Sequence, residues 1–201
     1  MAITTEMVKE LRAATGAGVL EAKKALEQND GDFDKAVDML REKGAARAAK
    51  RADRTAREGT IELYAHPGNR VGVMLELNCE TDFVARNEQF RELAHDLALH
   101  IAAASPRYLT TEEVPVAELE REASVLRSQA LAEGKPEAII EKVVSGRITK
   151  FYEEFCLLEQ PFIKDEKIKI KDMLTDAIRV TGENIVIRRF ARYELGESLE
   201  D

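Results

Sequence analysis

Cysteine is scarce in this chain of 201 residues, which has only two. Cys79 and Cys156 lie far apart in the sequence, and each sits inside a hydrophobic pattern. This arrangement excludes a disulfide framework and also lacks the close spacing of metal-binding cysteines. We therefore expect both cysteines to be small core residues.

Long hydrophobic runs are also missing. No apolar stretch is long enough to span a bilayer, and the start of the chain lacks the basic and apolar regions of a secretory signal. A composition of 44% hydrophobic and 34% charged residues is typical of a soluble globular chain. The sequence therefore predicts a cytoplasmic protein with no membrane partner.

Positive charge is in short supply over most of the chain. The net charge of −8 argues against broad nucleic-acid binding, which needs a basic face. Residues 41–57 differ, because seven Lys or Arg there face only two acidic residues. This Ala/Arg-rich stretch is typical of an extended, solvated connector, which we place at residues 46–58. The alternative interpretation is a binding segment for RNA or the ribosome.

We expect a small three-helix bundle over residues 1–45. The first helix ends at the glycines of residues 16–18, and the second ends at the Asn-Asp-Gly turn of residues 29–31. Gly44 is expected to close the third helix. The apolar stripe of that helix comprises Phe33, Ala36, Val37 and Leu40.

Beyond residue 58 the hydrophobic period changes from helical to alternating. The stretches TIELYAH and RVGVMLELNC flank Pro67-Gly68-Asn69, which predicts a β-hairpin. A helix that ends before Ser105-Pro106 supplies a cover for one face of the hairpin. Its expected apolar stripe is Phe90, Leu93, Ala94, Leu97 and Ile101.

Two long helical patterns follow, separated only by Gly134-Lys135, and predict an antiparallel helical hairpin at about residues 115–158. We expect Leu119, Ala123, Leu126 and Ala130 to face Ile139, Val143, Ile148, Phe151 and Phe155. A short helix then stops at Gly182, and NIVIRRFARYEL is expected to join the earlier hairpin as a third antiparallel strand.

These elements predict an α+β fold. The N-terminal three-helix bundle precedes a core over residues 59–201. We expect that core to be a three-stranded antiparallel sheet covered by helices, with the helical hairpin protruding from it.

The sequence offers no catalytic, metal-binding or cofactor-binding constellation. The three histidines lack the i, i+4 pairing of a helical metal site, and His100 is expected to be a satisfied edge residue. TGAGVLEAKK follows a helix and lacks the signature of a phosphate-binding loop. Thr81 and Asp82 precede a helix and are expected to act as N-cap residues. We therefore predict a protein without catalytic chemistry of its own.

Phe83 stands where a strand gives way to a helix, within CETDFV. It lies seven positions before Phe90, so helical periodicity favours a core position on the same stripe. The alternative is an exposed wedge at the open end of the helix. The pattern leaves both interpretations open.

Three stretches resemble the elongation factor Ts family, the bacterial and organellar exchange factors for elongation factor Tu. They are LRAATGAGVLEAKKAL (11–26), ELNCETDFVA (76–85) and GRITKFYEEFCLLEQPFIKD (146–165). The resemblance implies a ubiquitin-associated-like domain at residues 1–45 and an elongation factor Ts core after the connector. Long members carry two related core halves, whereas this chain resembles the short form. A homodimer that binds two copies of Tu is therefore implied.

The resemblance also implies site residues. Asp82 and Phe83 would enter the nucleotide-binding domain of Tu and disturb its Mg²⁺, while Thr81 and Val84 hold the corner. The N-terminal bundle would dock on the same domain through Arg12, Val19 and Leu20. Together these features imply promotion of GDP exchange for GTP on Tu, with no cofactor. The alternative function is a peptide- or RNA-binding adaptor without exchange activity.

Overall fold

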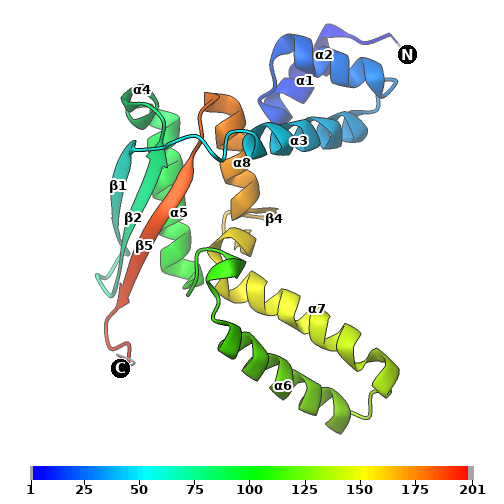
Figure 1. Cartoon of the computed structure of the whole chain (residues 1–201). Coiled ribbons are helices and arrows are strands. Elements are labelled where there is room, and N and C mark those ends of the chain that lie inside the picture. The colour runs from blue at the N-terminus through cyan, green and yellow to red at the C-terminus, as the bar shows by residue number, and fades with distance from the viewer. Residues whose placement is uncertain (1, 199–201) are drawn as a thin grey trace. The chain divides into compact units, whose positions relative to one another are not determined.

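The fold is given by a computed structural model that describes residues 2–198 (Figure 1). These residues form two compact units. The first comprises the chain up to Gly59 together with Cys79–Ala85 and Leu174–Val186, and the second comprises Thr60–Asn78, Arg86–Met173 and the chain from Ile187 onward. The expected α+β class is confirmed.

The first unit contains the expected N-terminal helical bundle of α1 (Thr5–Thr15), α2 (Val19–Gln28) and α3 (Phe33–Ala49). Side chains cap two of these helices, because Thr4 accepts a hydrogen bond from Met7 N and Asp32 accepts one from Lys35 N. The apolar faces meet in one core made of Val8, Leu11, Ala17, Ala22, Ala25, Leu26, Ala36 and Leu40.

The expected end of α3 at Gly44 is wrong, because the helix continues to Ala49. Gly44 does not end the helix; its lack of a side chain leaves room for a neighbouring residue. A Cβ built at this position would lie 3.3 Å from Cδ of Arg179, in α8 (Ile170–Thr181). The first residues of the predicted connector are consequently helical and not extended. The division into domains at residues 45 and 58 stays a prediction.

The second unit is built on a sheet of three strands in the order β1-β2-β5. The strands are β1 (Glu58–Ala65), β2 (Val71–Cys79) and β5 (Val186–Glu194). The hairpin hydrogen bond from His66 N to Val71 O joins β1 to β2. The bond from Leu195 N to Arg70 O places the end of β5 beside the start of β2. Both contacts fit the antiparallel sheet that the sequence predicts.

Helix α5 (Glu88–Ala104) covers one face of this sheet (Figure 1). It begins at Asn87, which caps the amide of Gln89, and ends at Ser105 in a left-handed conformation. Val73, Leu75 and Leu77 of β2 are buried, and so are Phe90, Ala94, Leu97 and Ile101 of the expected helix stripe. The two apolar patterns differ in period because side chains alternate across a strand but recur about every three to four residues on one face of a helix.

The helical hairpin consists of α6 (Val116–Ala132) and α7 (Glu137–Phe155). Gly134 turns the chain between them with a φ of 72°. Its core contains Leu126, Ala130, Ile140 and Val144. The expectation that Ile139 faces α6 is wrong, because Ile139 is 42% exposed and Ile140 occupies the buried position. The buried stripe of α7 starts one residue later than the pattern indicated.

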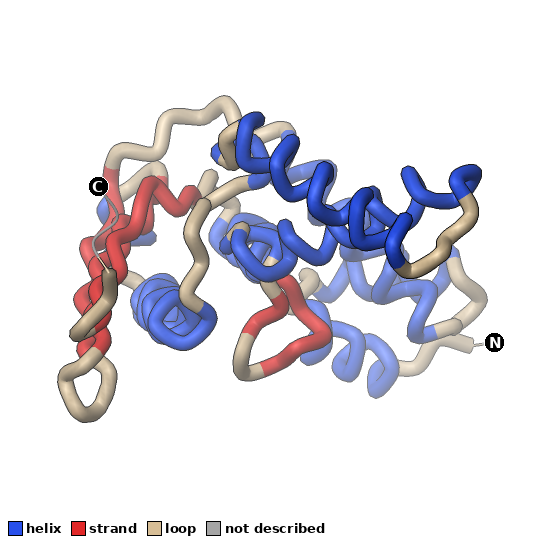
Figure 2. The backbone as a smooth tube through the Cα atoms, turned by 90° about the horizontal axis from the view of Figure 1, so that it is seen from below, coloured by secondary structure: helices blue, strands red, loops and turns tan. Residues whose placement is uncertain are grey.

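A second, two-stranded sheet was not predicted. It pairs β3 (Pro161–Phe162) with β4 (Asp165–Lys169), and Figure 2 shows it as a group of strands apart from the main sheet. Its sequence is mostly charged, so it carries no alternating hydrophobic signal. Short 3-10 turns occur at Thr111–Glu113 and Leu157–Glu159. None of the helices formed by residues 2–198 has both the length and the apolar character that a bilayer crossing requires.

Candidate functional site

The corner at residues 81–84 is a single helical turn, α4 (Asp82–Ala85), placed directly after β2. Thr81 caps this turn as expected. Its Oγ1 accepts a hydrogen bond from Val84 N at 3.4 Å, and its carbonyl oxygen accepts one from Ala85 N at 3.2 Å. The chain leaves helical geometry at Arg86 and Asn87 before α5 begins.

Phe83 points into solvent with 83% of its surface exposed. The interpretation of Phe83 as a core residue is therefore wrong. Periodicity misled because α4 and α5 are separate helices, so counting 100° per residue from Phe83 to Phe90 crosses a break. Thr81, Asp82 and Val84 are half-buried, which leaves the ring as the part of the corner most available to a partner.

A carboxylate from a distant part of the sequence holds this corner. Glu183 accepts hydrogen bonds from Glu80 N (3.1 Å) and Thr81 N (3.0 Å) through one oxygen. Its other oxygen accepts a hydrogen bond from the Thr81 hydroxyl at 2.6 Å. Hydrogen bonds to an ionised acceptor are stronger than neutral ones, so Glu183 fixes the start of α4.

The contact is reciprocal. Asn184 N donates to Oε1 of Glu80 at 2.7 Å, and the Asn184 side chain donates to the carbonyl oxygens of Ala52 and Arg54. We call Glu80, Thr81, Glu183 and Asn184 the clasp. It ties the end of β2 to the segment that follows α8.

Cys79 lies beneath the clasp and is fully buried. Its thiol donates to the carbonyl oxygen of Thr81 at 3.2 Å. Burial first, and then the nearby Glu183 carboxylate, raise the pKa of Cys79 to about 11. Cys156 is equally buried, and burial also raises its pKa to about 11. Both thiols are core residues as expected and are protonated at neutral pH, so neither is poised as a nucleophile.

The residues predicted to dock the N-terminal bundle lie around the turn between α1 and α2. Arg12 donates from Nε to the carbonyl oxygen of Ala17, and this bond braces the turn. Val19 and Leu20 begin α2 with 53% and 75% of their surfaces exposed. These two adjacent exposed aliphatic side chains form a small apolar patch at the start of α2.

Gly16 keeps that turn close to α8. It adopts a left-handed φ of 63°, and a Cβ built there would lie 3.1 Å from a guanidinium nitrogen of Arg179. The Arg179 side chain is only 10% exposed and also pairs with Asp176 at 3.2 Å. The end of α8 is thus fitted against the bundle, four residues before it reaches the clasp.

The basic segment is partly engaged within the fold. Arg47 pairs with Glu21 at 2.9 Å, and Arg51 donates to the carbonyl oxygen of Ile178 at 3.2 Å. Arg54 approaches Glu80 of the clasp at 3.5 Å. These contacts give Arg47, Arg51 and Arg54 a structural role within the fold, and the interpretation of the segment as an RNA-binding stretch stays a prediction.

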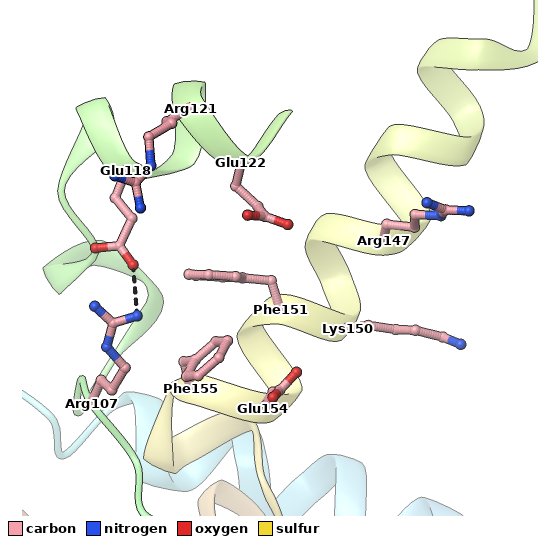
Figure 3. Close-up of a pocket in the computed structure, with 9 residues that line it drawn as sticks. All are labelled: Arg107, Glu118, Arg121, Glu122, Arg147, Lys150, Phe151, Glu154 and Phe155. Atoms are coloured by element: carbon pink, nitrogen blue, oxygen red, sulfur yellow. Dashed lines mark ion pairs between the residues drawn. The ribbon is translucent and has the colours of Figure 1, made fainter. Parts of the chain in front are cut away.

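A cavity of about 330 Å³ lies at the base of the helical hairpin, and none of the predicted site residues lines it (Figure 3). The rings of Phe151 and Phe155 form its apolar wall, and Arg107 spans the opening toward Glu118 at 3.0 Å. Four basic and three acidic side chains line it, so their charges nearly cancel. Nothing in this arrangement selects a ligand.

Within residues 2–198, no group of three or more His, Cys, Asp or Glu side chains is placed to hold a metal ion. His100 is buried with both ring nitrogens engaged, by Gln160 Oε1 at 2.9 Å and by Ile163 N at 3.3 Å. The described residues therefore present an exposed ring on a braced corner and an apolar patch, which are features of a binding surface.

Comparison with known proteins decides the family. The family model described as Elongation factor TS matches residues 2–197. The chain belongs to the elongation factor Ts family. Elongation factor Ts of Carboxydothermus hydrogenoformans is 56% identical over 98% of this chain and 91% of that protein. Elongation factor Ts of Herpetosiphon aurantiacus is 56% identical over 98% of this chain and its own full length.

A third relative, elongation factor Ts of Syntrophus aciditrophicus, is 54% identical over the whole of both chains. The chain covers nine tenths or more of each of these relatives. Membership of the elongation factor Ts family makes the protein a translation elongation factor.

The site residues differ in how far the sequence could reveal them. Thr81 to Val84 lie together at one corner, whereas Arg12, Val19 and Leu20 lie on a separate surface at the α1–α2 turn. No local pattern pointed to Glu183, because it contacts Thr81 across a separation of 102 residues. Only a prediction of how the end of α8 meets the end of β2 could have found it.

Proposed function

We propose that this protein binds elongation factor Tu carrying GDP and accelerates release of the nucleotide. The observation that carries the proposal is the ring of Phe83, which is held out into solvent by a braced, one-turn helix. Exposing an aromatic side chain has no benefit for the free protein, whereas buried aromatic anchors dominate binding energies at interfaces. The family supports Tu as the partner.

In this proposal Phe83 enters the nucleotide-binding domain of Tu near its Mg²⁺ site, with Asp82 beside it. Mg²⁺ requires near-ideal octahedral geometry, so a small displacement of its ligands weakens the hold on the phosphates. Thr81 and Val84 keep the corner in shape and contribute little contact themselves. Phenylalanine suits this role because it is bulky and loses little side-chain entropy on burial.

The physical basis is linkage. A protein that binds nucleotide-free Tu more tightly than GDP-bound Tu must lower the affinity of Tu for GDP by the same factor. No covalent bond is made or broken by this chain. We therefore infer that it acts as a guanine nucleotide exchange factor and not as an enzyme, and that it acts in the cytoplasm, where Tu serves translation.

We propose that the N-terminal bundle supplies a second contact to Tu. Val19 and Leu20 would pack on an apolar patch of the partner, and the Arg12 guanidinium would face a polar group at its rim. We retain residues 1–45 as a ubiquitin-associated-like docking domain. Two separate contacts raise affinity because the second forms within a complex that already exists.

We further propose that the chain forms a homodimer, so that a complex contains two copies of each protein. The sheet face opposite α5 carries exposed apolar side chains from all three strands, namely Ile61, Leu63, Met74 and Tyr193. An apolar sheet face of this kind is costly to leave in water and marks an interaction surface. A second copy offers a face of the same character.

The direct test is release of fluorescent GDP from purified Tu, followed by stopped-flow fluorescence with and without the intact chain. We expect release to become faster with increasing chain concentration and then to saturate. The acceleration should diminish when the free Mg²⁺ concentration is raised, because Mg²⁺ bound to Tu competes with insertion of the Phe83 ring. A release rate independent of the chain would refute the proposed function.

A further inference from the structure

We propose that Glu183 is a positioning residue for exchange, and that it holds α4 so that Phe83 is presented in a single orientation. The inference rests on the function proposed above. Glu183 lies 102 residues from Thr81 in the sequence, and its carboxylate bonds to Glu80 and Thr81, the two residues before α4. Its effect on the partner would pass through the backbone of the clasp.

The corner needs such support because α4 is short. A helix of four residues satisfies almost none of its own backbone groups, and isolated helices of this length are unstable in water. Glu183 accepts the amide hydrogens of Glu80 and Thr81 and the Thr81 hydroxyl hydrogen. That hydroxyl in turn accepts from Val84 N, so the carboxylate anchors the residues on both sides of the ring.

The anchor is itself fixed. The Glu183 backbone follows Gly182, whose φ of 76° ends α8, and Glu183 N donates to the Thr181 hydroxyl at 3.3 Å. Asn184 then bonds to Glu80 from the other side. Glu183 thus connects a terminated helix to two residues of the corner, Glu80 and Thr81, through three hydrogen bonds, which limits the movement of α4.

The orientation of Phe83 affects binding because a disordered corner must lose conformational entropy when the complex forms. A corner that is already rigid loses less conformational entropy when the partner closes on it. Releasing the corner would leave Phe83 chemically unchanged but oriented over many directions. We therefore expect loss of the Glu183 anchor to reduce exchange mainly through the ring, with a smaller share through Asp82 of the same helical turn.

Glu183→Ala removes the three hydrogen bonds that the Glu183 carboxylate accepts from Glu80 and Thr81. We expect GDP release from Tu at saturating chain to slow by about tenfold, equivalent to about 1.4 kcal/mol. Glu183→Gln should retain most of the activity, within about threefold. Its amide oxygen can accept from Glu80 N and Thr81 N, and its amide nitrogen can donate to Thr81 Oγ1. Glu166→Ala, at an exposed glutamate of β4, is the matched control.

A double-mutant cycle separates positioning from general stabilisation. If Glu183 acts through the ring, adding Glu183→Ala to Phe83→Ala should slow release by less than about twofold further. If Glu183 only stabilised the fold, Glu183→Ala would slow GDP release by about tenfold in both backgrounds. That result would overturn the proposal. If Glu183→Ala does not fold by circular dichroism, Thr81→Val replaces it in the cycle. This change deletes the hydroxyl that donates to Glu183 Oε1 and accepts from Val84 N, so it releases the same corner.

The two proposals can fail separately. If Phe83→Ala stimulates release as well as the unaltered chain does, the wedge function itself is refuted. If Phe83→Ala abolishes stimulation while Glu183→Ala leaves it unchanged, the function stands and the positioning role of Glu183 is overturned. We expect stimulated GDP release to be lost with each single alanine variant and largely retained with Glu183→Gln. The double variant should lose little more than Phe83→Ala alone.

Discussion

Replacing Phe83 with alanine is the most informative perturbation of the proposed site. The ring is 83% exposed in the free chain, so its removal leaves no cavity in the core. We expect the free energy of unfolding to change by no more than about 0.5 kcal/mol, as for other surface substitutions. Any large effect on exchange would therefore arise in the complex and not from loss of fold.

The expected loss follows from the area that the ring would bury. A phenylalanine side chain buries roughly 150 Å² or more at an interface. At about 25 cal/mol per Å², full burial contributes about 4 kcal/mol. Alanine keeps the Cβ, so we expect a loss of about 3 kcal/mol, which corresponds to a stimulation of GDP release that is about 100-fold weaker. This magnitude is within the range measured for interface hot spots.

The assay is stopped-flow release of fluorescent GDP from Tu at several chain concentrations. Thermal unfolding of each variant verifies the fold. Val116→Ala truncates another exposed apolar side chain, at the start of α6, and should leave release unchanged. If Phe83→Ala and Val116→Ala stimulated release equally, the reasoning from the exposed ring would be refuted.

Three further predictions concern the docking patch, the dimer and the buried histidine. Leu20→Ala should raise the chain concentration needed for half-maximal GDP release by about tenfold and leave the maximal rate unchanged, because a docking contact affects binding before the chemical state of Tu changes; an altered maximal rate alone would contradict this. Leu63→Lys places a charge on the apolar sheet face, so light scattering should give the mass of one chain, whereas an unchanged dimer mass would exclude that face. Burial lowers the pKa of His100, and protonation would also break the bond that Nδ1 accepts from Ile163 N. The unfolded chain therefore takes up the proton first, so stability present above pH about 6.5 should fall as the pH drops below that value. A urea midpoint that stays constant between pH about 7.5 and 5.5 would contradict the assignment.

The local elements of the fold follow from signals that the sequence contains. The turn at residues 29–31, the alternation through β2 and the stripe of α5 each predicted an element that the structure confirms. These signals are local, since period and turn chemistry act over a few residues. The end of α3 was misplaced because Gly44 acts by accommodating Arg179, which is a contact between distant segments.

The candidate site was less predictable for the same reason. The motif pointed to Thr81 and Asp82 as capping residues, and the structure confirms the cap at Thr81. Whether Phe83 is exposed depends on the break at Arg86 and Asn87, where Asn87 caps a new helix although the apolar pattern could have continued. Glu183 carries no local signal at all, because its partners are set by the tertiary fold.

The central claim is that the Phe83 ring leaves water when the chain binds Tu. It is tested most directly by fluorine NMR of 4-fluorophenylalanine placed at this position, with a soluble paramagnetic agent that broadens exposed nuclei. The account predicts strong broadening in the free chain, protection in the complex with nucleotide-free Tu, and renewed broadening when GDP and Mg²⁺ release the chain. Equal broadening of the fluorine signal in the free chain and in the complex would contradict it.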